Sequence, residues 1–248
     1  MTWPYRTLVR PALFKQDSEQ IHNRTLKLLG AVSRRPFLCR ILAKLYQTPN
    51  LPVSAFGLNF PNPVGLAAGM DKFGAALPAW HALGFGFSEL GGITWRPQPG
   101  NPAPRMFRAV RDRALINRMG FNNPGAEAMA GTLAGWRSSD RWPSHPVGIN
   151  LGKSKVTPLE QAAEDYASSF RALRAHADFF VINVSSPNTP NLRQLQDRSA
   201  LDEILGALQE VNAQGAPPPK PILVKVAPDL SFQALDELLQ LAAPRAIA

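Results

Sequence analysis

A polar loop that follows an apolar run is the first place in this sequence where chemistry is expected. Residues 179–184 are aromatic and β-branched, as in a strand that is buried on both faces. The chain continues with Ser185-Ser-Pro-Asn-Thr-Pro-Asn191, whose two prolines and polar side chains suit a stiff loop. An ordinary turn has the same composition. The residues at the ends of the other apolar runs therefore help to distinguish a simple turn from a ligand-binding or catalytic site.

Polar residues recur at the ends of those runs. A buried amide or ammonium group without a partner costs roughly 1–3 kcal/mol or more, so Asn150, Asn183 and Lys225 in apolar surroundings need an explanation. Each one alone fits a satisfied polar group of the core. Together with Lys72 and the run Asn117-Arg-Met-Gly-Phe-Asn-Asn123, they favour a shared, planar, polar ligand. Lys225 lies between two valines, which suits charge that develops on a cofactor.

The elements that would position these residues alternate between strand and helix. The predicted strands lie near 63–68, 86–91, 146–151, 178–184 and 220–226, and the predicted helices near 74–83, 124–135, 158–176, 199–213 and 231–243. This alternation predicts parallel strands, either in a doubly wound sheet or in a (β/α)8 barrel. The Gly-rich segments lack the spacing of a dinucleotide-binding fold or a P-loop. We therefore predict an α/β fold of the (β/α)8 TIM-barrel type, incomplete, with about five βα units.

Residues 1–50 differ from residues 51–248 in charge, and we predict that they form separate domains. They carry nine Lys/Arg against two Asp/Glu, a net +7 out of +9 for the chain. Helical spacing predicts two amphipathic helices there, one capped by Asp17 and one beginning near Pro36. This basic pair suggests a peripheral membrane segment, and a helical lid packed on the main domain is the alternative. No nucleic-acid partner is expected, because no binding motif accompanies the charge.

Composition narrows the class of protein further. With 45% hydrophobic and 18% charged residues, the 248-residue chain has an ordinary globular composition. No apolar run reaches the roughly 18 residues of a membrane-spanning helix. The single Cys39 excludes an internal disulfide framework, and no metal site is predicted.

Four motifs follow one another along the chain: Gly65-Leu-Ala-Ala-Gly-Met-Asp-Lys72, Asn117-Arg-Met-Gly-Phe-Asn-Asn123, Asn183-Val-Ser-Ser-Pro-Asn-Thr189 and Val224-Lys-Val-Ala-Pro-Asp-Leu230. In sequence and order they resemble motifs of the quinone-dependent, class 2 dihydroorotate dehydrogenases. The resemblance runs from about residue 8 to about residue 240. It implies an FMN-containing barrel that oxidises (S)-dihydroorotate to orotate in de novo pyrimidine (UMP) biosynthesis and reduces a membrane quinone. Class 1 relatives use a cysteine base, whereas Cys39 lies far from the catalytic loop.

The resemblance also implies roles for individual residues. Ser186 would be the base that takes a proton from C5 of the substrate while hydride leaves C6 for the flavin. The implied substrate contacts are Lys72, Asn117, Arg118, Met119, Gly120, Phe121, Asn183 and Asn188. The implied cofactor contacts are Ala68, Gly69, Met70, Asp71, Lys72, Gly92, Asn150, Asn183 and Lys225. His22 stands where a histidine of the quinone pocket is expected, and a structural histidine is the alternative.

Two features depart from the family pattern. Gly92 stands where the family usually has Ser or Thr beside the flavin, so a hydroxyl is lost. The chain also stops after five predicted strands, before the loops after strands 7 and 8 that would bind phosphate. We expect a C-terminally truncated chain that is a poor enzyme, peripheral on the cytoplasmic side of the cell membrane. The alternatives are an inactive membrane-associated remnant and a related FMN barrel acting on another pyrimidine.

Overall fold

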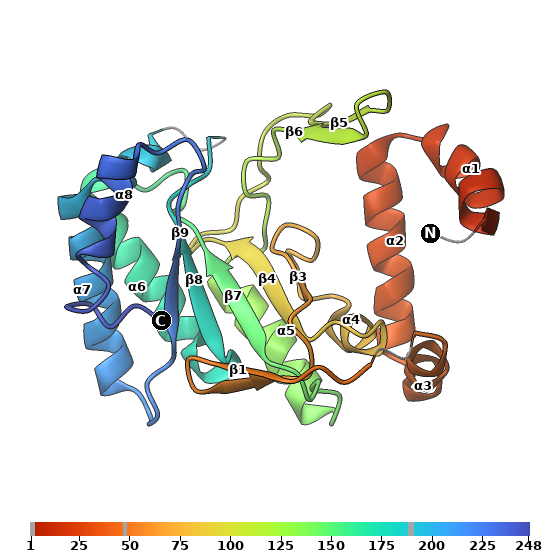
Figure 1. Cartoon of the computed structure of the whole chain (residues 1–248), viewed down its shortest axis with the longest axis horizontal. Helices are drawn as coiled ribbons and strands as arrows, with labels where there is room; N and C mark the ends of the chain where they lie inside the picture. Colours follow the sequence, from red (N-terminus) through yellow and green to blue (C-terminus); the bar gives the residue numbers. More distant parts are fainter. Residues whose placement is uncertain (1–2, 47–48, 188–190) are drawn as a thin grey trace.

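The structure, a computed structural model, describes residues 3–46, 49–187 and 191–248. At its centre lies a parallel sheet whose strands follow one another in chain order (Figure 1). They are β3 (Gly65–Leu66), β4 (Phe87–Ile93), β7 (Val147–Leu151), β8 (Phe179–Asn183) and β9 (Ile222–Lys225). Each strand adds beside its predecessor, as in a barrel, whereas a doubly wound sheet reverses its order at a switch point. The five predicted strands and their barrel-type order are confirmed, and the described residues form an open sheet.

The helices that follow these strands in the chain pack on one face of the sheet (Figure 1). They are α4 (Leu77–Ala82), α5 (Ala126–Ser138), α6 (Ala162–Leu173), α7 (Arg198–Gln214) and α8 (Phe232–Leu239). Short 3-10 turns at Leu159–Gln161 and Arg174–His176 flank α6, and another precedes α7 at Leu192–Gln196. Leu90, Ile149 and Phe180 contribute fully buried side chains to the core under these helices. All five predicted crossover helices are present, with shifts of a few residues at their ends.

The opposite face of the sheet is closed at the amino ends of its strands by a hairpin, β1 (Val53–Ala55) and β2 (Leu58–Phe60). Phe60 of the hairpin packs edge-to-face on Phe87 with ring centroids 5.6 Å apart, and Phe87 packs on Phe179 at 6.2 Å. A Cβ at Gly148 would lie 2.2 Å from the Phe179 ring, so glycine makes this packing possible. The carboxyl ends of the strands are left for the polar residues.

The inserted segment between β4 and α5 contains an antiparallel pair, β5 (Met106–Ala109) and β6 (Ala114–Asn117). It contacts the N-terminal helix α2 (Ser18–Ser33): the Ser18 hydroxyl donates a hydrogen bond to the Met106 carbonyl at 2.5 Å. Arg105 pairs with Glu19 of α2 at 2.7 Å, and both side chains are mostly buried. The insertion therefore joins the N-terminal segment to the rim of the sheet (Figure 1).

The N-terminal segment contains more helix than predicted. Asp17 caps α2 by accepting from the Gln20 amide, and α3 (Pro36–Leu45) begins at the predicted proline. A π-helical turn at Tyr5–Val9 and α1 (Arg10–Phe14) were not predicted, because they are short and no side-chain cap marks their start. Within the described residues, no helix is both long enough and apolar enough to cross a membrane.

The two predicted helices of this segment differ in packing. On α2, Leu26, Gly30 and Ser33 are buried, and the Ser33 hydroxyl accepts a hydrogen bond from the Ala79 amide of α4 at 3.1 Å. On α3 no residue is fully buried: Leu38 and Leu42 are half-buried, and Phe37, Ile41 and Leu45 are exposed. Helix α2 thus packs on the main domain, whereas α3 keeps an apolar surface that no part of the described chain covers.

Candidate functional site

A cavity of about 260 Å³ lies at the carboxyl ends of the parallel strands. All five strands or the loops after them contribute to it, together with the inserted segment. Its lining consists of Ala67, Ala68, Gly69, Lys72, Glu89, Gly92, Asn117, Met119, Gly120, Phe121, Asn150, Asn183, Ser186 and Lys225. Every one of these except Ala67 and Glu89 was predicted from the sequence as a substrate, cofactor or catalytic residue. Segments far apart in the chain therefore converge on one site.

A continuous chain of hydrogen bonds, here called the amide relay, crosses the floor of this cavity. It consists of Glu89, Asn150, Asn183, Ser185 and Lys225, on or beside four adjacent strands. The Asn150 amide nitrogen donates to Glu89 at 2.7 Å, and the Asn183 amide nitrogen donates to the Asn150 oxygen at 2.9 Å. The Ser185 hydroxyl donates to the Asn183 oxygen at 2.8 Å and accepts from the Lys225 ammonium at 2.9 Å. Asn150 and Asn183, whose burial was expected from the sequence to require hydrogen-bond partners, thus have such partners.

Lys72 is a buried cation on the opposite wall, with only 8% of its surface exposed. Its ammonium donates to the Asn122 side-chain oxygen at 2.6 Å. Burial and the positive charge of the nearby Arg105 lower the pKa of Lys72, Glu19 partly opposes them, and the pKa falls to about 8. A cation held at a desolvation cost in a cavity is suited to bind an anionic group such as a carboxylate.

Ser186 lies in the cavity wall just beyond the end of β8, where it is half-buried. The loop that carries it is held from behind by Arg193, which donates to the Ser185 carbonyl at 3.2 Å. Arg193 also pairs with Asp229, in the loop after β9, at 2.8 Å. Asn188, predicted to contact the substrate, lies outside the described residues.

Three predicted contacts are placed outside this cavity. The Asp71 carboxylate accepts from the Ala75 and Ala76 amides and from the Trp80 indole, so it organises the start of α4. The Arg118 side chain is exposed and donates to the Pro104 carbonyl. Met70 lines a different cavity. The side chains of Asp71 and Arg118 are thus used in contacts within the chain, and the roles predicted for these two residues stay predictions.

Gly92 has a steric reason to depart from the family pattern. A Cβ at this position would lie 2.7 Å from the Phe121 ring and 3.2 Å from the Asn150 side-chain oxygen. Phe121 itself has a positive φ of 51°, which directs its ring over Gly92 and Gly152. A side chain at residue 92 requires that ring to move.

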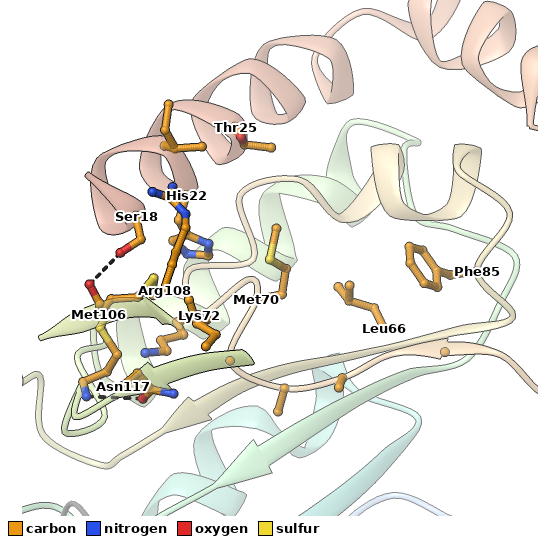
Figure 2. A pocket seen from close by; sticks show the side chains of 17 residues that line it. Ser18, His22, Thr25, Leu66, Met70, Lys72, Phe85, Met106, Arg108 and Asn117 are labelled. Carbon is orange, nitrogen blue, oxygen red and sulfur yellow. Dashed lines mark hydrogen bonds between the residues drawn. The ribbon is translucent and has the colours of Figure 1, made fainter. Parts of the chain in front are cut away.

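A second, larger cavity of about 720 Å³ lies between α2 and the loop after β3 (Figure 2). From α2 it is lined by Ser18, Ile21, His22 and Thr25, and from the main domain by residues that include Leu66, Met70, Phe85, Met106, Arg108 and Leu115. Burial lowers the pKa of His22, and the positive charge of Lys72 lowers it further. A largely apolar cavity beside a neutral imidazole suits a ligand with an apolar body and a polar tip.

The two cavities share one wall. Both are lined by Ala67, Ala68, Gly69, Lys72, Asn117 and Met119. Because the first three have at most a methyl side chain, the separation there consists largely of main chain. A ligand in one cavity is therefore close to a ligand in the other.

Comparisons with known proteins identify the family of this chain. The sequence model described as dihydroorotate dehydrogenase matches residues 50–246. The chain belongs to the dihydroorotate dehydrogenase family. Within that family it groups with the quinone-dependent, class 2 enzymes, which are oxidoreductases.

Similar family members come from bacteria and from a protozoan. The dihydroorotate dehydrogenase (quinone) of Chloroflexus aurantiacus is 51% identical over 98% of this chain and 69% of its own length. A dihydroorotate dehydrogenase (quinone) of Thermus thermophilus is 55% identical over 92% of this chain and 64% of its own length. A crystal structure of DHODH from Eimeria tenella with ferulenol superimposes with a TM-score of 0.82 at 32% identity. The superposition covers 95% of this chain and 68% of the Eimeria tenella chain. The chain thus spans about two thirds of the length of these dihydroorotate dehydrogenases.

Sequence reasoning missed two members of the amide relay, Glu89 and Ser185. A signal for Glu89 was present, since it is the one charged residue in the strand Phe87–Ile93. Strand alternation could have placed it opposite Leu90 and thus on the cavity face. Ser185 was overlooked beside the predicted base, Ser186.

Proposed function

We propose that this chain carries the dihydroorotate-oxidising site of an FMN- and quinone-dependent dihydroorotate dehydrogenase of de novo pyrimidine biosynthesis. The substrate would be (S)-dihydroorotate, the product orotate and the electron acceptor a membrane quinone. The observation that carries the proposal is the wall shared by a polar cavity and a largely apolar one. Two half-reactions, one with a polar substrate and one with a lipid-soluble acceptor, need that geometry.

The polar cavity has the residues that a flavin ring requires. Ala68, Gly69 and Gly92 have no bulky side chain, so a flat ring can approach the main chain. Asn150 and Asn183 offer amide groups, and Lys225 offers a positive charge that would stabilise a reduced, anionic ring. When bound, FMN supplies hydride acceptance and electron delivery to the quinone. The residues present therefore fit the ring portion of FMN.

The substrate side of the cavity would use Lys72, Asn117 and Ser186. The ammonium of Lys72 would balance the substrate carboxylate, and the amides would orient the pyrimidine ring. Ser186 Oγ would take the proton from C5 while hydride leaves C6, so that the C5–C6 double bond of orotate forms. Because a free serine has a pKa far above neutrality, proton transfer has to pass on from Ser186 through its surroundings.

The acceptor side would consist of the second cavity, which His22 of α2 helps to line (Figure 2). His22 would face the quinone head. We further propose that α3 docks this entrance on the cytoplasmic face of the cell membrane as a peripheral contact. Phe37, Ile41 and Leu45 repeat every four residues and are 51–73% exposed. The net charge of +7 in residues 1–50 would add attraction to anionic lipids.

Ser186→Ala tests the proposed chemistry. We expect at least a hundredfold loss of quinone-dependent orotate formation with unchanged flavin absorbance, because general-base catalysis contributes roughly 10²–10⁴-fold. Ser138→Ala, on the exposed end of α5, removes a hydroxyl far from the cavity and should not change turnover. Near-normal turnover of Ser186→Ala would remove Ser186 from its role. Vesicle binding by a purified chain with no flavin absorbance would favour the membrane-associated remnant instead.

A further inference from the structure

Two histidines are in contact at the amino ends of the strands, at the end of the sheet opposite to the polar cavity. His81 lies in the last turn of α4, and His145 lies two residues before β7. Their rings pack edge-to-face with centroids 4.9 Å apart. His145 is 1% exposed and His81 is half-buried. Neither residue lines the two cavities, so the proposed reaction gives this pair no task.

The partners of the two rings determine which nitrogen carries a proton. His145 Nδ1 lies 2.8 Å from the Phe85 carbonyl oxygen, which can only accept, so this nitrogen must be protonated. In the neutral ring, His145 Nε2 then accepts from the Ser88 hydroxyl at 3.0 Å. His81 Nδ1 lies 3.2 Å from the protonated His145 Nδ1 and must therefore accept from it. The proton of a neutral His81 is left on Nε2, which is 3.3 Å from the Ser144 hydroxyl.

The surroundings favour the neutral form of both rings. Burial lowers the pKa of His81. Burial and the positive charge that His81 can carry lower the pKa of His145, the hydrogen bond to the Phe85 carbonyl partly opposes them, and the pKa falls to about 4. The other ionisable side chains on the elements packed against α4 are Glu19, His22, Arg24 and Lys27 of α2, Cys39, Arg40 and Lys44 of α3, and Glu89 of β4. In the described parts of the chain, none of these contributes to either shift.

We propose that His81 and His145 form a pH-sensitive clasp that holds α4 on the amino ends of β4 and β7 only while both rings are neutral. A proton added to His81 Nδ1 would place two N–H donors against each other, and the contact would open. Because the closed clasp excludes protons that free histidines bind below about pH 6.5, its contribution to stability is complete above that pH. The contribution is lost as the pH falls toward about 4, the pKa of His145.

Release of α4 would reach both cavities through two contacts of this helix. The Trp80 indole donates to the Asp71 carboxylate at 3.0 Å, and the next residue, Lys72, lines both cavities. The Ala79 amide donates to the Ser33 hydroxyl of α2 at 3.1 Å. Acid would therefore loosen the loop after β3 and the end of α2 together. This inference concerns the fold and does not depend on the proposed function.

Hydrogen exchange at single amides of α4 measures the clasp where it acts. The Trp80 amide donates to the Ala76 carbonyl and the Leu83 amide to the Ala79 carbonyl. After correction for the intrinsic effect of pH on exchange, their protection should fall about 100-fold per pH unit between about pH 6 and pH 5. This slope corresponds to two protons bound on opening, whereas a single excluded proton gives about 10-fold per pH unit.

Two matched substitutions separate the clasp from two independent histidines. His81→Gln keeps a side chain that can accept from His145 and never gains a charge, so the slope at α4 should fall by one proton. His176→Gln, which replaces a half-buried histidine after α6, should leave the slope at α4 unchanged. An unchanged slope in His81→Gln would overturn the proposal. So would an equal fall in His176→Gln, because α4 would then open only with the whole fold.

The proton positions give a second test, which also decides the matter if His81→Gln fails to fold. Nitrogen-15 NMR of the imidazole rings in the unaltered chain, at about pH 7.5, distinguishes a proton on Nδ1 from one on Nε2. We expect the proton on Nδ1 in His145 and on Nε2 in His81. The opposite assignment in either ring would contradict the clasp. None of these measurements needs bound flavin or turnover, so failure to bind FMN would count only against the proposed function.

Discussion

In the cavity floor every side chain of the amide relay is hydrogen-bonded to a neighbour on or beside an adjacent strand, whereas α3 leaves Phe37, Ile41 and Leu45 exposed to solvent. The first region is ordered by its own contacts within the sheet. The second has an apolar surface that nothing in the described chain covers. The difference teaches that polar groups can be buried where rigid strands supply partners, while apolar groups on the surface indicate a partner outside the chain. Three predictions use this contrast, in order of expected effect.

Breaking the relay in its middle should cost the most stability. Asn150→Leu removes the donor to the half-buried Glu89 and the acceptor for the buried Asn183 amide nitrogen, and leaves both without these partners. We expect a loss of about 3 kcal/mol in the free energy of unfolding, equivalent to a fall of about 6–12 °C in Tm. Thermal and urea denaturation measure this. Asn50→Ala, at an exposed position, should change Tm by less than about 2 °C. Equal losses of stability in Asn150→Leu and Asn50→Ala would show that the hydrogen bonds of the cavity floor contribute no more than an exposed surface position does.

Placing a charge on the apolar face of α3 should leave the stability of the fold nearly unchanged and should weaken membrane binding. Ile41→Asp should leave Tm nearly unchanged, because Ile41 is 51% exposed. Its binding to vesicles of phosphatidylglycerol and phosphatidylcholine should weaken by about 10- to 100-fold, because burial of an isoleucine contributes about 1.5–3 kcal/mol. Ala43→Asp puts the same charge on the far side of the helix and should weaken binding less. Identical sedimentation of both variants with vesicles would disprove α3 as the docking face.

Lys72 lines both cavities, and its charge can be tested by changing the pH. With its pKa lowered to about 8, Lys72 is mostly protonated at pH 7 and loses its charge as the pH rises. The affinity for orotate should therefore be constant below about pH 7 and fall by up to about tenfold for each pH unit above 8. Calorimetric titrations at several pH values measure this. Lys72→Met should bind weakly at every pH, and a steep pH dependence that persists in this variant would assign the titration to another group.

Much of the fold and site could be predicted because the relevant signals are local. The start of α2 at Asp17 and of α3 at Pro36 follow from capping and proline geometry. The convergence of Asn150, Asn183 and Lys225 follows from the rule that parallel strands end at one edge.

The parts that could not be predicted depend on contacts between distant segments. Both α2 and α3 have an apolar face in the sequence, but the sequence does not reveal that Leu26 of α2 packs with Leu66, Ala76 and Trp80 while Ile41 of α3 stays exposed. Motif similarity placed Asp71 in the site, although its carboxylate is directed to the Ala75 and Ala76 amides. A motif identifies a neighbourhood in the chain and does not give the direction of each side chain.

The wall of Ala67, Ala68 and Gly69 between the two cavities has a consequence for how ligands and electrons would move in the proposed enzyme. Main chain and methyl groups separate the two cavities there, and in the proposed enzyme this separation would be thin enough for electrons to tunnel through. In the proposed enzyme, a water-soluble reductant and a lipid-soluble oxidant would then never compete for the same space.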